Sequence, residues 1–182
     1  AVTVLDSLER GYRTAVDVRA RLVEGRVGDP DAVRDALRGV EAVLHCAGLI
    51  EVAESEQFPG RYWQANVVEP LTLVEAIVES GVEALVFSST AAVYGEPLPV
   101  NTYGATKLAF EQVSESFQRS HGLRVVRLRY FNVAGAWPDG SLGEAHDPET
   151  HILPRILGSL ASGTNRFEVF GFRDANWWLD FP

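Results

Sequence analysis

The segment Ala84-Leu85-Val86-Phe87-Ser88-Ser89-Thr90 places a nearly continuous apolar run directly before three side chains that carry hydroxyl groups. Apolar runs this short and this continuous are typical of strands buried on both faces of a parallel sheet. We therefore predict a strand over residues 84–88. Similar short runs predict further strands over residues 2–5, 21–23, 42–45, 124–129 and 167–170.

Segments with helical periodicity lie between the predicted strands. Asp29 and Pro30 are typical of an N-cap followed by a first-turn proline, and a helix is expected to follow them. Two longer helices are predicted over residues 60–79 and 103–120, with Gly81 and Gly122 as stop signals. A last helix is predicted over residues 152–161. Strands that alternate with helices in this way predict an α/β fold with a doubly wound, Rossmann-like parallel sheet.

Composition narrows the class of protein. The 182 residues are 46% hydrophobic and 23% charged, which is typical of one globular domain and not of a disordered or fibrous chain. Because 25 acidic residues outweigh 16 basic ones, for a net charge of −9, we expect neither a nucleic-acid nor a membrane partner. The single cysteine, Cys46, cannot form an internal disulfide, so a cytoplasmic location is expected.

In doubly wound sheets, ligands bind outside the carboxyl ends of the strands. Asp6 follows the first strand, where a carboxylate can bind both hydroxyls of an adenosine ribose and favours NAD over NADP; a turn aspartate is the alternative. The small residues of His45-Cys46-Ala47-Gly48 allow a ligand to approach the backbone closely, although such residues also form ordinary turns. The hydroxyls of residues 88–90 either face the same cleft or close a local turn.

Tyr103 and Lys107 are four residues apart on a predicted helix, so they share one helix face. A nearby ammonium lowers the pKa of a phenol, and the pair can then transfer a proton at neutral pH. Such pairs also occur by chance. The composition argues against chance here, because Lys107 is the single lysine beside fifteen arginines.

The segment 135–150 is rich in Gly, Pro and Asp and predicts a long surface loop. His146 and His151 lie in or beside it, next to acidic residues. Their spacing matches no regular ligand pattern, so we expect no metal site.

Three motifs carry a family resemblance. They are Phe87-Ser88-Ser89-Thr90-Ala91-Ala92-Val93-Tyr94-Gly95, Tyr103-Gly104-Ala105-Thr106-Lys107, and Arg129-Tyr130-Phe131-Asn132-Val133-Ala134-Gly135-Ala136. Together they resemble the extended short-chain dehydrogenase/reductase family. Residues 4–6, 47–50 and 143–151 make the chain most similar to the NAD-dependent sugar-nucleotide epimerases of that family. The resemblance covers residues 2–171.

The resemblance implies an isomerase that interconverts UDP-glucose and UDP-galactose by transient hydride transfer to bound NAD. Tyr103 would take the proton from the sugar 4-hydroxyl, and Thr90 would hydrogen-bond that hydroxyl. Lys107 would hold the nicotinamide ribose and lower the pKa of Tyr103.

The resemblance also implies binding residues and a homodimer. The other NAD contacts would be Asp6, Ser7, Leu8, Cys46, Ala47, Gly48, Leu49 and Phe131. The UDP-sugar contacts, besides Thr90, would be Asn132, His151, Ile152 and Phe170. A homodimer would form through the helices predicted over 60–79 and 103–120.

Several features depart from the family pattern. Arg26 stands where an aspartate is usual, and Ala65 replaces the first Asn of a usual Asn-Asn-Val. No glycine-rich phosphate loop is present; it would precede Ala1. We therefore expect a partial NAD-binding domain with the start of a substrate region over residues 1–171, and a divergent tail over 172–182.

Two other functions stay open. A sugar-nucleotide 4,6-dehydratase of the same fold would need an Asp-Glu pair after Thr90, where Ala91 and Ala92 stand. A non-catalytic nucleotide-binding fragment is the other, and Arg26 and the expected truncations favour it.

Overall fold

The computed structural model describes residues 1–95, 99, 101–164, 166–170 and 176–180. The chain divides into two compact units, Ala1–Phe131 and Asn132–Pro182. Each unit is described by itself.

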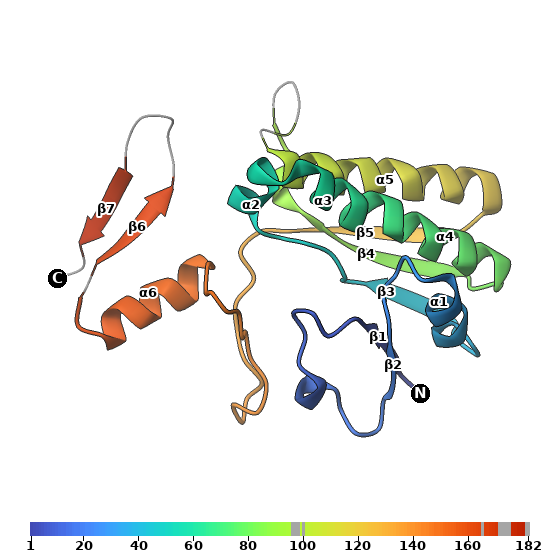
Figure 1. The fold of residues 1–182 in the computed structure, drawn as a ribbon, viewed down its shortest axis with the longest axis horizontal. Coiled ribbons are helices and arrows are strands. Elements are labelled where there is room, and N and C mark those ends of the chain that lie inside the picture. Colours follow the sequence, from blue (N-terminus) through green and yellow to red (C-terminus); the bar gives the residue numbers. More distant parts are fainter. Residues whose placement is uncertain (96–98, 100, 165, 171–175, 181–182) are drawn as a thin grey trace. The chain divides into compact units, whose positions relative to one another are not determined.

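The first unit contains two parallel sheets (Figure 1). One pairs β1 (Thr3–Asp6) with β2 (Arg21–Glu24); the other has the order β3-β4-β5, with β3 (Ala42–His45), β4 (Ala84–Thr90) and β5 (Arg124–Tyr130). The parallel pairing and the flanking helices confirm the predicted Rossmann-like α/β fold.

Helices connect these strands. They are α1 (Pro30–Ala36), α2 (Val52–Gln57), α3 (Pro59–Trp63), a π-helical turn (Gln64–Val68), α4 (Glu69–Glu79) and α5 (Thr102–His121), with short 3-10 turns at Arg13–Ala15 and Ala91–Val93.

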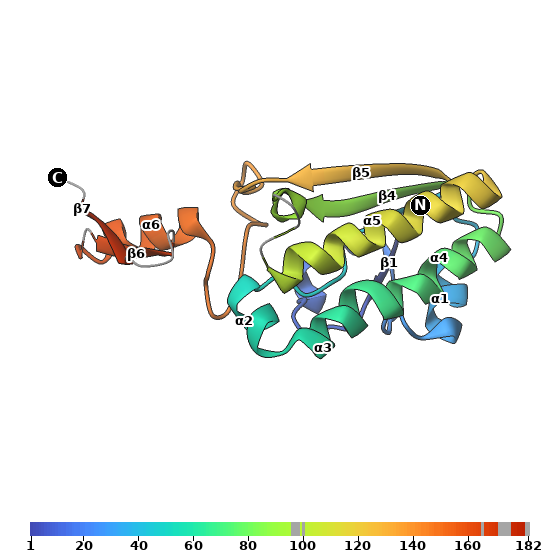
Figure 2. The same ribbon diagram turned by 90° about the horizontal axis from the view of Figure 1, so that it is seen from above.

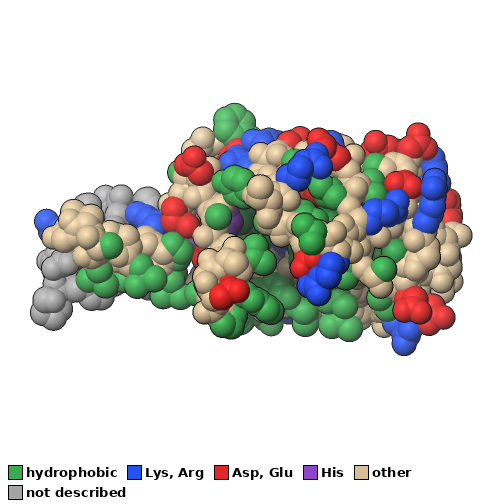
Figure 3. Space-filling view, turned by 90° about the horizontal axis from the view of Figure 1, so that it is seen from below, with side chains coloured by type: hydrophobic (Ala, Val, Ile, Leu, Met, Phe, Trp, Pro, Cys, Tyr) green, Lys and Arg blue, Asp and Glu red, His purple; other side chains and the backbone are tan. Residues whose placement is uncertain are grey.

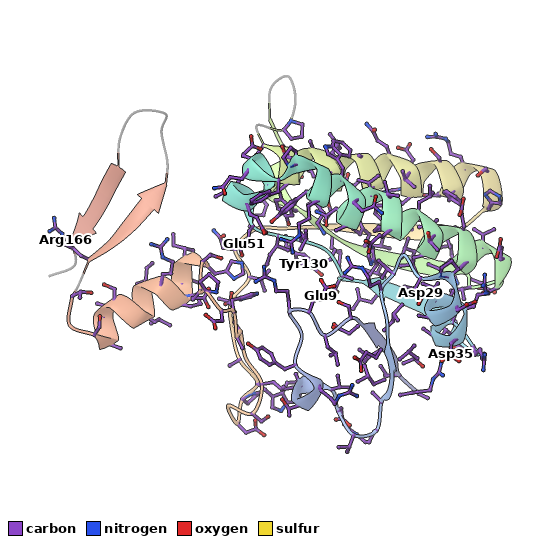
Figure 4. The ribbon with its side chains drawn as sticks, viewed as in Figure 1. Glu9, Asp29, Asp35, Glu51, Tyr130 and Arg166 are labelled. Carbon is purple, nitrogen blue, oxygen red and sulfur yellow. The ribbon has the colours of Figure 1, made fainter. Side chains whose placement is uncertain are left out.

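The residues predicted to begin and end the helices do so in the structure. Asp29 caps α1 by accepting hydrogen bonds from two backbone N–H groups of its first turn. The label in Figure 4 marks Asp29 beside α1. Gly81 and Gly122 follow α4 and α5 with φ of 70° and 71°, a left-handed conformation that glycine adopts without strain.

Helices α4 and α5 lie side by side on one face of the three-stranded sheet (Figures 1 and 2). The core lies between them and the sheet. Its largest fully buried apolar side chains are Tyr62, Ile77, Leu85, Phe87 and Phe110.

The opposite face of this sheet is exposed. Val126, Leu128 and Tyr130 of β5 alternate with residues that contact α5, and Leu44 of β3 is 64% exposed. Figure 3 shows hydrophobic side chains at the surface on the side seen from below. The expectation of strands buried on both faces is therefore wrong for β3 and β5, because the described helices of this unit cover one face.

The second unit contains an irregular segment, α6 (Ile152–Ala161), and the antiparallel pair β6 (Arg166–Phe170) and β7 (Asn176–Asp180). The helix has the predicted bounds, and the irregular segment confirms the predicted loop over 135–150. The predicted boundary after residue 171 stays a prediction. Within the described residues, no helix combines the length and apolarity that crossing a membrane requires.

Candidate active site

The predicted catalytic side chains meet where β4 ends and α5 begins. Thr90 is the last residue of β4, and Tyr103 and Lys107 lie on the first turns of α5. The Tyr103 side chain is hydrogen-bonded to Thr90, and the Lys107 ammonium lies 5.9 Å from the centre of the Tyr103 ring. The end of β4 therefore meets the start of α5 here, and the four-residue spacing of Tyr103 and Lys107 on one face of α5 brings both side chains close to Thr90.

Tyr103 is half-buried, and this burial decides its acidity. Burial raises the pKa of Tyr103 above its ordinary value, and the hydrogen bond with Thr90 lowers it by less. The expectation that Lys107 lowers this pKa stays a prediction. The ammonium is close to the ring, and among the described residues no hydrogen bond joins it to the phenol oxygen.

Lys107 is almost completely buried, with 3% of its surface exposed. Its Nζ donates a hydrogen bond to the Ser88 carbonyl at 3.1 Å and lies 5.1 Å from the centre of the Phe87 ring. Burial lowers the pKa of Lys107 to about 8. An ammonium has three donors, and in the described part of the chain the hydrogen bond to Ser88 is the one it makes. It can therefore bind further hydroxyl oxygens.

Asn66 links the loop after β3 to α5, although no role was predicted for it from the sequence. It lies in the π-helical turn, which interrupts an otherwise continuous helix. Its Oδ1 accepts a hydrogen bond from Leu49 N at 2.8 Å, and its Nδ2 donates to Leu49 O and Thr106 Oγ1 at 3.0 and 3.1 Å. The sequence did contain a signal, which is an asparagine within an otherwise apolar segment of the predicted helix. Such π-helical turns occur frequently at functional sites.

Gly48 brings the loop after β3 against the same site. Its φ is 151°, and a Cβ at this position would lie 2.8 Å from Asn66 Oδ1 and 3.4 Å from Lys107 Nζ. A side chain here would therefore displace Asn66. The loop is expected to line the cofactor, and its Cys46 is exposed.

Hydrogen bonds and close packing hold the start of α5 in place. Asn101 caps the helix by accepting a hydrogen bond from Gly104 N at 2.7 Å, and Ser55 Oγ accepts one from Tyr103 N at 3.1 Å. A Cβ on Gly104 would lie 2.1 Å from the Ala92 carbonyl oxygen. The glycine thus lets the helix carrying Tyr103 pack directly against the turn that follows Thr90.

One helical turn beyond Lys107, Glu111 holds the two strands together. It accepts two hydrogen bonds from Arg129, at 2.7 and 3.0 Å, and one from Ser89 at 2.5 Å. Burial alone would raise the pKa of Glu111, but these hydrogen bonds lower it below its ordinary value. The Arg129 guanidinium lies 4.9 Å from the centre of the Tyr94 ring. The network fixes the strand residue before Thr90 relative to α5.

Asp6 lies at the end of β1, as predicted. Its Oδ1 accepts a hydrogen bond from Leu8 N at 2.7 Å, so the carboxylate closes a turn. Ser7 accepts one from Glu9 N at 3.5 Å. Asp6 and Leu8 also line a cavity of about 650 Å³ that contains none of the three catalytic candidates.

Arg26 is paired with acidic side chains. It forms ion pairs with Glu69 at 3.1 Å and with Glu9, which is labelled in Figure 4. These partners, first of all Glu69, raise the pKa of Arg26. The arginine that replaces the usual aspartate at this position is therefore stabilised by its acidic neighbours.

The other predicted site residues are not part of the group formed by Thr90, Tyr103 and Lys107 in the first unit. Phe131 ends the unit and is 77% exposed. The predicted sugar-nucleotide contacts belong to the second unit: Asn132, His151, Ile152 and Phe170. His151 precedes α6 as its N-cap residue, Ile152 is its first residue, and Phe170 ends β6.

The residues of the first unit fit a dinucleotide. The buried Lys107 ammonium has three hydrogen-bond donors, and the structure describes one acceptor for them, the Ser88 carbonyl. It lies beside the loop of small residues that follows β3. Asp6 places a carboxylate at the end of a parallel strand, the position that binds a ribose in this class of fold.

Comparison with known proteins identifies the family. Residues 1–181 match the NAD dependent epimerase/dehydratase family. The chain belongs to this family. It is 42% identical to a UDP-glucose 4-epimerase of Lactobacillus helveticus over 93% of the chain, and 44% identical to one of Corynebacterium glutamicum over 95%.

A crystal structure of UDP-glucose 4-epimerase from Brucella ovis in complex with NAD superposes with a TM-score of 0.83, at 36% identity over 88% of the chain. The chain spans about half the length of these proteins: 56% and 55% of the two relatives, and 53% of the solved chain.

Proposed function

We propose that this chain is the NAD-binding part of a UDP-glucose 4-epimerase. The observation that carries the proposal is the meeting of Thr90, Tyr103 and Lys107 at the end of β4. The similarity to epimerases over more than nine-tenths of the chain supports it. The complete protein would interconvert UDP-glucose and UDP-galactose.

The proposed roles follow from the geometry. A sugar hydroxyl that binds between Thr90 and Tyr103 would donate its proton to the phenolate form of Tyr103, with Thr90 keeping the two oxygens aligned. Because burial raises the pKa of Tyr103 in the chain by itself, this role requires that Lys107 and bound NAD favour the phenolate. Lys107 would bind ribose hydroxyls with the donors that Ser88 leaves available. Asp6, Ser7 and Leu8 would hold the adenosine side, and Cys46, Ala47, Gly48, Leu49 and Phe131 would contact the cofactor. NAD, when bound, supplies the hydride acceptor.

The second unit would supply the sugar-nucleotide contacts Asn132, His151, Ile152 and Phe170. A homodimer through α3–α4 and α5 is proposed from the family resemblance. A cytoplasmic location is proposed from the single cysteine.

The experiment uses the full-length protein that contains this chain. With UDP-galactose and NAD, we expect UDP-glucose as the product, and Tyr103→Phe should lower kcat by about 10²- to 10⁴-fold. An unchanged melting temperature of the variant would show that the fold is intact. Tyr103→Phe with undiminished epimerisation would contradict the role of this tyrosine.

The same incubation separates the alternatives. A product lighter than the substrate by one water would indicate the dehydratase, which Ala91 and Ala92 disfavour because they cannot act as acid or base. Binding of NAD and UDP without turnover would indicate the non-catalytic protein.

A further inference from the structure

The segment before α6 brings together two histidines and two glutamates. Glu144, His146, Glu149 and His151 each offer one potential ligand atom, and these four atoms lie within 4.8 Å of one another. All four residues belong to the second unit, so this arrangement does not depend on the site at β4. Their spacing, Glu-x-His-x-x-Glu-x-His, matches no regular motif, and no metal site is predicted there from the sequence.

The cluster converges on one carboxylate oxygen. Glu144 Oε1 contacts His151 Nδ1 and lies 3.3 Å from His146 Nδ1. Glu149 Oε1 lies 3.8 Å from His151 Nδ1. The two imidazole rings stand nearly perpendicular, at 87°, with their centres 4.4 Å apart. Both Nδ1 atoms therefore approach the same point from different directions.

Two of the three separations are close to those of a tetrahedral metal site. Zinc binds histidine nitrogen and carboxylate oxygen at about 2.0–2.2 Å, which places neighbouring ligand atoms roughly 3.4 Å apart. The separations of 3.3 and 3.8 Å lie on either side of that value, whereas Glu144 Oε1 and His151 Nδ1 are in direct contact and would have to move apart to admit an ion. The two carboxylates would neutralise a divalent charge.

The donor set selects the kind of metal. Two imidazole nitrogens favour a first-row transition metal ion such as Zn²⁺, whereas Mg²⁺ and Ca²⁺ prefer sites made of oxygen alone. Four protein ligands would close the coordination sphere, as in structural zinc sites.

We propose that Glu144, His146, Glu149 and His151 form a structural site for one Zn²⁺-class ion, which fixes residues 144–151 at the start of α6. The proposal is independent of the proposed function. His151 binds the ion through Nδ1. The ion takes no part in a reaction step.

The test measures metal binding directly. The 182-residue chain and the full-length protein are stripped with a chelator, dialysed, and titrated with Zn²⁺, Mg²⁺ and Ca²⁺ in a calorimeter. We expect one Zn²⁺ per chain, bound at least about 100-fold more tightly than Mg²⁺ or Ca²⁺.

Two variants test the ligands, and one serves as a control. His146→Ala and the isosteric Glu149→Gln should each weaken Zn²⁺ binding by about tenfold or more. His121→Ala removes an exposed histidine of α5 outside the cluster and should leave the affinity unchanged. Circular dichroism checks that each variant is folded.

Three results would overturn the site. They are the absence of Zn²⁺ binding by folded protein, unchanged affinity in both ligand variants, and an equal loss in His121→Ala. The first would mean that the four side chains are held by hydrogen bonds alone.

Discussion

At the scale of single residues, the most consequential position is Lys107. Its ammonium lies in the interior, between the end of β4 and the ring of Tyr103. Removing a charge from water costs free energy unless partners replace the water. One hydrogen bond, to the Ser88 carbonyl, replaces only part of the hydration that the ammonium loses. Burial therefore lowers the pKa of Lys107 to about 8. The site thus retains a group that destabilises the fold.

This cost predicts a pH dependence of stability. The folded pKa, about 8, lies below the ordinary value of 10.5, so between these pH values the unfolded chain binds more protons than the folded one. The contribution of Lys107 to the free energy of unfolding therefore rises with pH across that interval, by on the order of 3 kcal/mol.

Lys107→Met should raise the free energy of unfolding at pH 7 and reduce its increase between pH 8 and 10.5. Urea denaturation at a series of pH values measures both. Because every other titrating group is shared, the difference between the two proteins isolates this ammonium. Parallel curves for the two proteins would contradict the burial argument.

Glu111 gives a second prediction at this scale. It is buried and bonded to Arg129 and Ser89, so Glu111→Ala leaves a guanidinium and a hydroxyl without their acceptor. We expect a loss of about 2–4 kcal/mol in the free energy of unfolding, since Arg129 is partly exposed. The matched control is Glu115→Ala on the same helix, whose exposed pair with Arg119 should contribute less than about 0.5 kcal/mol. Similar losses in the two variants would show that the network does not stabilise the site.

At the scale of elements, the site depends on how closely α5 approaches the turn after β4. Gly104 sits at the point of contact with Ala92. Alanine is favoured over glycine in helices by about 1 kcal/mol, so propensity and packing act in opposite directions here. A contact of 2.1 Å between a Cβ and a backbone oxygen cannot be accommodated without moving the helix.

Gly104→Ala should therefore lower the melting temperature and the affinity for NAD together. The control is Gly158→Ala within α6, where a Cβ would have no neighbour within 4 Å. That change should stabilise its helix by about 0.5–1 kcal/mol. Thermal denaturation and NAD titration of the full-length variants measure the effects. A Gly104→Ala protein as stable as its parent would refute the steric argument.

Elements with clear terminal signals could be predicted from the sequence. Asp29-Pro30, Gly81 and Gly122 placed helix ends within a residue or two, because capping is a local property. The π-helical turn was missed, since residues 64–68 continue the periodicity of the helix. Helix α2 was missed as well, because its six residues carry little apolar pattern.

The site was partly predictable for similar reasons. The spacing of Tyr103 and Lys107 placed them on one helix face. The direction of the Tyr103 pKa could not be predicted, because it depends on burial, which is set by packing between distant segments. The hydrogen bonds of Asn66 to Leu49 and Thr106 likewise join segments 17 and 40 residues apart.

At the scale of the whole molecule, the uncovered sheet face of the first unit is the main feature. Val126 and Leu44 are 52% and 64% exposed on the side away from α5. Contiguous apolar surface of this kind promotes association with other apolar molecules. The family relatives are nearly twice as long as this chain.

The 182-residue chain by itself should therefore bind an apolar dye such as ANS. The double change Leu44→Lys and Val126→Lys should reduce the dye fluorescence at least about twofold. Val18→Lys is the control, because that valine is fully exposed outside the sheet. Equal fluorescence from the chain and the double variant would mean that the dye binds elsewhere.

Because Lys107 is the single lysine of the sequence, proteolysis after this residue can measure the local unfolding of α5. A protease that cleaves only after lysine has one target bond, between Lys107 and Leu108, within the buried part of α5. Cleavage requires that this helix opens, so its rate measures the opening equilibrium of the catalytic helix. Ligands that close the site should slow the appearance of the two fragments, which allows them to be ranked without any assay of turnover.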